Sequence, residues 1–157
     1  MVILVELSWC KKKPNGIKLI TPNNNLSEEY INTAKETLET LKGIKNNSKV
    51  WLATTKYYTE YFAAYSLLMK IGIKSEIHEC TIKICELLEA EKILPKGYAK
   101  TLEEDKKLRI DNQYYLKNRS VKISYTEILD YVLTIQDIKE KLSIEQIESI
   151  RRKISKT

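Results

Sequence analysis

The apolar positions of the chain change their period after the first 25 residues. Residues 2–9 and 17–21 are short apolar runs rich in β-branched side chains, and an Asn-Gly dipeptide at 15–16 separates them. Asn-Gly is typical of a tight hairpin turn. We therefore expect an N-terminal β-hairpin within residues 1–25. Because an isolated hairpin is marginal in water, it should dock on the remainder of the chain.

From residue 26 onward the apolar positions recur every three or four residues, which is typical of amphipathic helices. Serine and threonine residues that suit helix N-caps precede most of these segments, and several have Glu or Gln three positions later. The expected caps are Ser27, Ser48, Ser75, Thr101, Ser124 and Ser143. The predicted helices span about 27–41, 48–71, 75–94, 101–116, 124–142 and 143–154.

The loops between these predicted helices are short, which favours helices packed against their neighbours in sequence. The segment 49–71 is apolar on two sides, so we expect it to be the central helix. The sequence thus predicts a mainly α protein: an antiparallel up-and-down bundle of four to six helices over residues 26–157, with the hairpin 1–25 as an extension of the same single domain.

Composition narrows the class of protein. Of the 157 residues, 43% are hydrophobic and 31% are charged, as in a globular domain. No apolar segment is long enough to span a membrane, and none resembles a targeting signal. We therefore expect a cytoplasmic protein with no membrane partner.

The sequence gives little evidence for a metal-binding site or for a disulfide bond. The three cysteines are odd in number and form no CxxC pair, so we expect reduced, partly buried thiols. A single histidine, His78, excludes a site built on several histidine ligands. We expect neither a metal nor a cofactor.

A formal net charge of +6 suits an anionic partner such as RNA, a nucleotide or an acidic protein, although a lysine-rich solvated surface has the same composition. The terminal clusters 11–13 and 151–153 leave open a helical DNA-binding protein. Affinity that falls steeply with salt and does not depend on Arg109 would favour that alternative.

Three features are candidates for a binding site, each with a simpler alternative. Arg109 either forms an ion pair with Asp105 one turn earlier or is held in a cleft for phosphate, which its planar guanidinium matches. The aromatic run 57–65 either stacks bases or, as we favour, packs in the core. His78 either bonds locally at a helix start, which we favour, or makes a polar contact in a groove.

Several of these residues together resemble the HEPN-domain family. The resemblance covers about residues 27–142 and rests on their order along the chain: Tyr57-Tyr58, Ala63-Ala64, Leu67-Leu68, Gly72-Ile73-Lys74-Ser75, His78, and an Arg-x-x-Ala-Asp-Tyr-like segment from Arg109 to Tyr114. The chain departs from the family pattern at Thr59, Asn112 and Gln113.

The resemblance implies an antiparallel bundle that dimerises around a cleft and is often encoded beside a minimal nucleotidyltransferase as a toxin–antitoxin pair. Toxic members are metal-independent ribonucleases in which a histidine follows the arginine after four to six residues. In this chain no histidine follows either Arg109 or Arg119. Tyr114 occupies the corresponding position, and a phenol is a poor base at neutral pH.

We therefore expect a binding protein rather than an enzyme: a homodimer that binds a nucleotide or RNA, or partners a nucleotidyltransferase. Arg109 would contact phosphate, and Tyr114 would hydrogen-bond it; alternatively, Tyr114 or Tyr115 would accept a nucleotidyl group. His78 and Lys74 would line the same groove. The alternatives are an endoribonuclease with Arg109 and Tyr114 as catalytic residues, and a structural module that uses the hairpin as an added edge strand.

Overall fold

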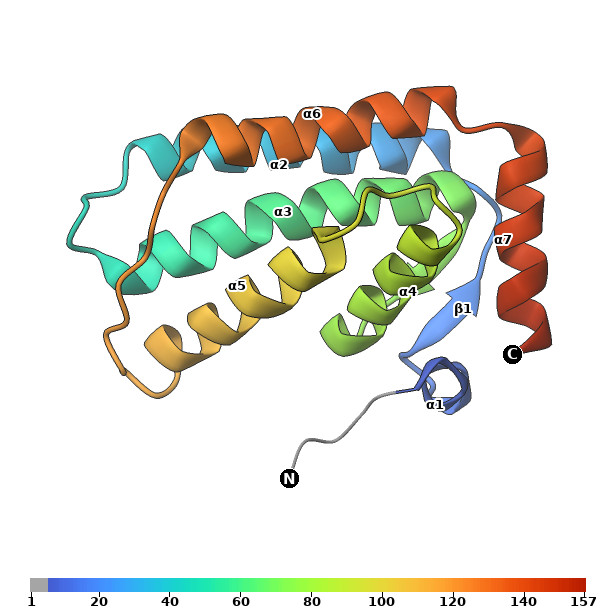
Figure 1. Cartoon of the computed structure of the whole chain (residues 1–157), viewed down its shortest axis with the longest axis horizontal. Coiled ribbons are helices and arrows are strands. Elements are labelled where there is room, and N and C mark those ends of the chain that lie inside the picture. Colours follow the sequence, from blue (N-terminus) through green and yellow to red (C-terminus); the bar gives the residue numbers. More distant parts are fainter. Residues whose placement is uncertain (1–5) are drawn as a thin grey trace.

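The computed structural model describes residues 6–157, and residues 1–5 lie outside this description. The described part is mainly helical, with one small sheet (Figure 1). Its elements are α1 (Leu7–Lys12), β1 (Ile17–Leu19), α2 (Asn24–Lys42), α3 (Lys49–Ile71), β2 (Ile73–Ser75), α4 (His78–Ala90), α5 (Tyr98–Gln113), α6 (Tyr125–Lys141) and α7 (Ile144–Lys156).

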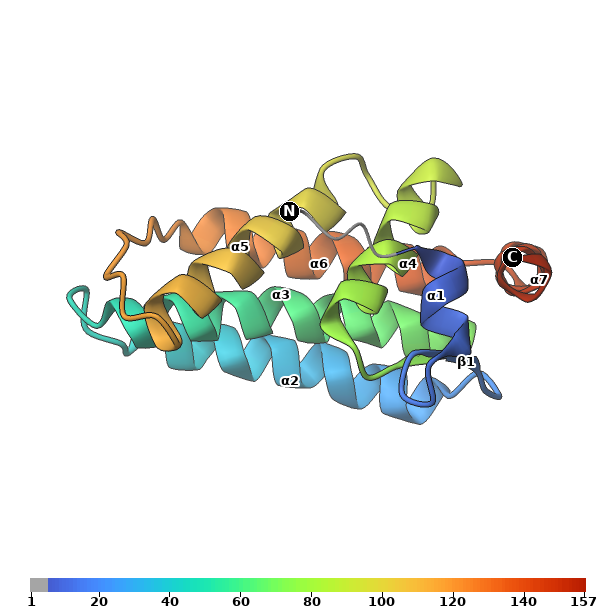
Figure 2. The ribbon, with the colours of Figure 1, turned by 90° about the horizontal axis from the view of Figure 1, so that it is seen from below.

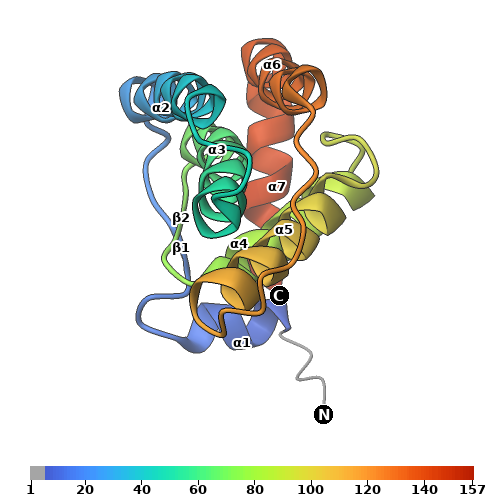
Figure 3. The same cartoon turned by 90° about the vertical axis from the view of Figure 1, so that its left-hand side faces the viewer.

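The long helices surround α3. Helices α2 and α6 lie side by side along one flank of α3, and α4 and α5 cross its opposite flank (Figures 1 and 2). Helix α7 stands across the end where α3 finishes, and the two strands run beside each other near α1 (Figure 3). None of the helices in residues 6–157 is long and apolar enough to cross a membrane.

The central position predicted for α3 is confirmed by its burial on several sides. Tyr57, Leu67, Leu68 and Ile71 are fully buried in the main core. The helix ends where predicted, because Gly72 takes the left-handed conformation (φ +89°) and its N–H bonds to the Leu68 carbonyl. A side chain at this position would collide with backbone and with a neighbouring guanidinium.

All six predicted helices are present, but several begin elsewhere. The hydroxyls of Ser124 and Ser143 cap α6 and α7 as predicted, with a complete capping box at Ser143. Helix α2 instead begins after Asn23, whose side chain accepts a hydrogen bond from the Leu26 N–H. Ser27 therefore lies inside the helix, and its hydroxyl bonds to the α3 backbone.

The N-cap prediction for Thr101 is wrong for the same reason, whereas Ser48 holds the predicted position without its capping bond. Helix α5 begins after Gly97, so the Thr101 hydroxyl lies within the helix and donates back to the Gly97 carbonyl. Ser48 precedes α3 but makes no side-chain capping bond. A serine or threonine near a helix start has local alternatives for its hydrogen bond, and the sequence alone does not choose between them.

The prediction of an N-terminal β-hairpin is wrong. Leu7–Lys12 forms α1, and residues 2–5 of the expected first strand lie outside the described residues. Strand β1 pairs instead with β2, antiparallel, with Ile17 opposite Ser75. The pairing therefore joins segments that are distant in sequence, and the third predicted helix loses its first residues to β2. Helix α1 still contributes to the core through Cys10.

The expectation of three reduced thiols is also wrong. Cys10 of α1 and Cys80 of α4 form a disulfide, with their Cα atoms 5.8 Å apart. Cys85 remains a free, buried thiol. The two bonded cysteines are 70 positions apart in sequence, and only the packing of α1 against α4 brings them together.

Reduction of this disulfide should lower the free energy of unfolding by about 4 kcal/mol, because the bond closes a long loop and so restricts the unfolded chain. At this chain length we expect the melting temperature to fall by roughly 10 °C. Thermal unfolding with and without dithiothreitol measures the shift. The Cys10→Ser variant is the matched control and should not respond to the reductant. Alkylation of all three cysteines in the denatured, unreduced protein would contradict the assignment.

Candidate functional site

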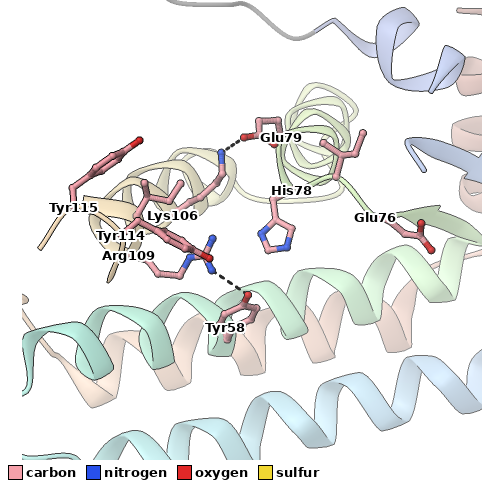
Figure 4. Close-up of a pocket in the computed structure, with 10 residues that line it drawn as sticks. Tyr58, Glu76, His78, Glu79, Lys106, Arg109, Tyr114 and Tyr115 are labelled. Atoms are coloured by element: carbon pink, nitrogen blue, oxygen red, sulfur yellow. Dashed lines mark hydrogen bonds and ion pairs between the residues drawn. The ribbon is translucent and has the colours of Figure 1, made fainter. Parts of the chain in front are cut away.

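A cleft of about 530 Å³, open to solvent, lies between helices α3, α4 and α5 (Figure 4). The first residues of α4, one face of α5, Tyr58 of α3 and the segment just after α5 form its walls. The lining residues are Tyr58, Glu76, Ile77, His78, Glu79, Lys106, Arg109, Ile110, Tyr114 and Tyr115. Four of the five binding residues predicted from the sequence therefore line a single cleft.

Arg109 lies at the base of this cleft and is 92% buried, with 8% of its surface exposed. Its guanidinium carbon lies 5.1 Å from the ring centre of Tyr57 and 5.3 Å from that of Tyr58, and one terminal nitrogen donates to the Tyr58 hydroxyl at 3.1 Å. Aromatic faces attract a cation and so offset part of its cost of burial. Figure 4 shows the side chain reaching from α5 toward α3.

The charge of Arg109 has no carboxylate partner among the ion pairs of residues 6–157. Its Nε atom is buried and makes no hydrogen bond within the described chain. The proposed ion pair with Asp105 is wrong, because Asp105 bonds to Lys56 of α3 instead. A guanidinium cannot lose its proton at ordinary pH, so this site retains an uncompensated positive charge.

His78 begins α4 and contacts α3 rather than its own helix start. Its Nδ1 atom lies 2.8 Å from the Tyr57 hydroxyl, and its ring stacks on Tyr61 with centres 4.4 Å apart. Burial lowers the pKa of His78 below its ordinary value, and the positive charges of Arg109 and Lys106 lower it further. The imidazole is therefore neutral at pH 7.

The Tyr57 hydroxyl determines which nitrogen of His78 carries the proton. Tyr57 is fully buried, and burial raises its pKa far above the ordinary value, so it keeps its hydrogen. His78 Nδ1 is the acceptor within reach of that hydrogen in the described structure, and a buried donor without an acceptor is costly. Nδ1 therefore accepts, and Nε2 carries the proton as a neutral donor.

Charged pairs occupy the rim of the cleft. Lys106, one turn before Arg109 on the same face of α5, bonds to Glu79 of α4 (Figure 4). Lys74 bonds to Glu76 at 3.2 Å, but it lies on β2 and does not line the cleft. Lys74 is thus the one predicted site residue placed beside the cleft rather than in it.

Tyr114 and Tyr115 form the outer wall. They follow directly after α5 and are 64% and 67% exposed. The Tyr114 ring centre lies 6.0 Å from the guanidinium carbon of Arg109. Both phenols are accessible to a ligand or to a partner protein, as the sequence-based hypothesis requires.

Sequence reasoning missed Tyr58 and Lys106 as members of the site. Lys106 had a local signal, since residues three apart share a helix face. Tyr58 belonged to an aromatic run that we assigned to the core, and that assignment is right for Tyr57, Tyr61 and Tyr65. Tyr58 is only partly buried, because its side of α3 faces the cleft.

A second cavity of about 460 Å³ lies between α3, α5 and α6. Lys56 and Glu60 line it, and Lys56 bonds to both Glu60, at 3.4 Å, and Asp105. Burial raises the pKa of Glu60 well above its ordinary value, and a hydrogen bond shared with Asp105 raises it further. Glu60 Oε1 makes no hydrogen bond within the described chain, but the Lys56 ammonium is paired with both carboxyl groups. Because each of these three groups has an ion-pair partner, this cavity is a weaker candidate for ligand binding.

The terminal basic clusters have structural partners. Lys11 donates to the carbonyls of Ser155 and Thr157. Arg151 donates to three carbonyls where α3 and β1 end, those of Ile20, Ile71 and Gly72. Within residues 6–157, no group of three or more His, Cys, Asp or Glu side chains is arranged to hold a metal ion.

In comparisons with known proteins, no family model, no curated protein and no solved structure matches the chain. The assignment of a function therefore rests on the chemistry of the cleft.

We expect His78 to titrate below pH 6.5, its ordinary pKa, and to carry its proton on Nε2 when neutral. Because Arg109 contributes to the shift, Arg109→Gln should raise the pKa of His78 and Arg109→Lys should leave it nearly unchanged. The chain has one histidine, so ring ¹⁵N NMR across pH 5–8 gives an unambiguous signal. A neutral ring protonated on Nδ1 would contradict the tautomer.

Glu60→Gln should stabilise the protein more at pH 8 than at pH 4. A carboxyl whose folded pKa is raised favours folding below its unfolded pKa, near 4.5, and loses that contribution as the pH rises. The amide has no proton to lose. Each kcal/mol gained should raise the melting temperature by roughly 2–4 °C. Glu104→Gln, an exposed glutamate on α5, is the control. An equal effect of Glu60→Gln at both pH values would refute the shift.

Proposed function

We propose that this chain is a HEPN-type helical bundle that binds the phosphate group of a nucleotide or of RNA in the cleft between α3, α4 and α5. One observation carries the proposal: the buried, uncompensated guanidinium of Arg109 at the base of a cleft. A phosphate would supply the negatively charged partner that Arg109 does not have among the described residues. Its oxygens also match the planar set of N–H donors on a guanidinium.

The neighbouring groups supply further donors. The Tyr58 hydroxyl accepts a hydrogen bond from Arg109, which leaves its own hydrogen free for a phosphate oxygen. The Nε2–H of His78 is a neutral donor from α4. Lys106 at the rim is paired with Glu79, so Arg109 is the cation of the cleft that an anion would neutralise. Donors from three helices thus surround the space where a phosphate would sit.

The family resemblance suggests the biological setting. We propose a homodimer that partners a minimal nucleotidyltransferase, in a toxin–antitoxin-like pair. The exposure of Tyr114 and Tyr115 supports this setting, because either phenol is open to a partner enzyme that transfers a nucleotidyl group.

A second candidate function is a metal-independent endoribonuclease. The observation that favours it is the presence of His78 and Arg109 in one cleft, although no histidine follows Arg109 in the sequence. Such an enzyme needs a base that removes the proton of the ribose 2′-hydroxyl. In the tautomer inferred above, Nδ1 accepts from Tyr57 and Nε2 holds the proton, so His78 has no free lone pair for this task. We therefore rank binding above catalysis.

Arg109→Ala should weaken the binding of adenosine 5′-monophosphate and of a short 5′-phosphorylated RNA by at least about tenfold, which corresponds to 1.4 kcal/mol. Arg109→Lys should retain part of the affinity, because lysine keeps the charge but loses the fork. Lys107→Ala removes one positive charge from an exposed position on the same helix and should change affinity little. Calorimetry measures these affinities.

Equal losses for Lys107→Ala and Arg109→Ala would contradict a specific phosphate site and favour general electrostatic attraction. Gel analysis of the same RNA after incubation tests the second function. Cleavage that disappears in both Arg109→Ala and His78→Ala would establish the ribonuclease in place of a binding protein. Circular dichroism of each variant confirms that it is folded.

A further inference from the structure

The segment that follows α5 has a fixed conformation. Asn112 is buried, and its side chain forms two hydrogen bonds with the backbone of Arg119: Oδ1 accepts from N–H at 2.7 Å and Nδ2 donates to the carbonyl at 2.9 Å. The Asp111 carbonyl accepts from the Lys117 N–H at 2.9 Å. Leu116 and Asn118 both take positive φ angles, 50° and 56°, which turn the chain back toward the helix.

The charged side chains of this segment reinforce the same shape. The Asp111 carboxylate bonds to the Arg119 guanidinium at 2.7 Å and to the Lys117 ammonium at 3.4 Å. These contacts tie residues 117–119 to the last turn of α5. Residues 114–116 lie between the ties, and each is more than 60% exposed. The loop therefore holds an apolar and aromatic surface outward, against the usual preference for burial.

The two tyrosines each lie beside a cation. Arg109 approaches the Tyr114 ring at 6.0 Å, and the Lys117 ammonium approaches the Tyr115 ring at 5.7 Å. Each of the two adjacent rings thus has a cation beside it, one at the base of the cleft and one on the loop. Sites for single-stranded nucleic acid combine these same two elements, cations for the phosphates and rings on which bases stack.

We infer that Tyr114 and Tyr115 form a base-stacking platform, and that the ligand of the cleft is a single-stranded polynucleotide rather than a mononucleotide. This inference rests on the proposed function, since Arg109 holds one phosphate. Bases adjacent to that phosphate stack on Tyr114 and Tyr115. Stacking is insensitive to base identity, so the platform accepts any sequence.

The test compares uridine 5′-monophosphate with 5′-phosphorylated oligo(U) of three and six residues, since uridines stack weakly on each other. The wild type should bind the trimer at least about fivefold more tightly than the mononucleotide, which stacks only one base, and the hexamer about as tightly as the trimer, because each stacked base contributes roughly fivefold or more. The double variant Tyr114→Ala/Tyr115→Ala should bind the trimer no more tightly than it binds the mononucleotide. Its affinity for the mononucleotide should itself fall by roughly fivefold, the contribution of one stacked base.

Two control variants separate stacking from other roles. Tyr114→Phe/Tyr115→Phe keeps the rings and removes the hydroxyls, so it should retain trimer affinity; a loss would assign the tyrosines to hydrogen bonding instead. Leu116→Ala alters the equally exposed neighbour, 72% accessible, and should change nothing. The same oligomers in the deoxy series show whether the ribose 2′-hydroxyl contributes to affinity.

The outcomes distinguish this inference from the proposed function. If Arg109→Ala weakens mononucleotide binding while affinity depends on neither length nor the tyrosines, the platform is refuted and the phosphate site stands. If Arg109→Ala has no effect on any probe, the phosphate site itself is refuted. If the double alanine variant instead changes the oligomeric state in light scattering and leaves trimer affinity intact, the exposed loop is a protein interface and the inference is overturned.

Discussion

The structure depends on how it accommodates one permanent charge at the base of a cleft. Arg109 is held by the faces of Tyr57 and Tyr58 and by one tyrosine hydroxyl, and no carboxylate of residues 6–157 forms an ion pair with it. Quadrupolar attraction to aromatic rings stabilises a cation without cancelling its charge, whereas a salt bridge would cancel it. The guanidinium therefore remains available to an anion from outside.

This arrangement requires three helices in fixed positions. Helix α3 brings the tyrosines, α5 brings Arg109, and the first residue of α4 brings His78. The disulfide at Cys80 joins the start of α4 to α1, and β2, directly before α4, pairs with β1. Arg151 of α7 binds the carbonyls where α3 ends. The smaller elements at this end of the molecule thus fix the start of α4, and with it one wall of the cleft.

Local sequence signals predicted the features that depend on local interactions. The six long helices, the central position of α3, the glycine stop at Gly72 and the caps at Ser124 and Ser143 all follow from periodicity and short-range hydrogen bonds. The gathering of Arg109, Tyr114, Tyr115 and His78 in one cleft agrees with the prediction that they share a groove. For Arg109 and the tyrosines, which are five and six positions apart in sequence, proximity along the chain accounts for part of this. His78 comes from another helix and was placed through the family resemblance.

The features that the sequence did not predict depend on contacts between distant segments. The apolar residues 7–10 suit a strand as well as a helix, and only the pairing of β1 with β2 leaves them to form α1. The disulfide joins cysteines that are 70 positions apart in sequence. Asp105 forms its ion pair with Lys56 of α3 and not with Arg109, one turn along its own helix. The tautomer of His78 likewise depends on Tyr57, a residue on another helix. These four features are set by contacts between segments that are distant in sequence, which local sequence patterns do not report.

The most direct test of the central claim is to follow the ring ¹⁵N signals of His78, the one histidine of the chain, while adenosine 5′-monophosphate is added to the protein. If phosphate binds at Arg109, the Nε2 signal should move in a saturable manner in the wild type and should not move in Arg109→Ala. Saturable binding of the nucleotide, detected by calorimetry, with the His78 signals unchanged would place the ligand elsewhere and contradict this account.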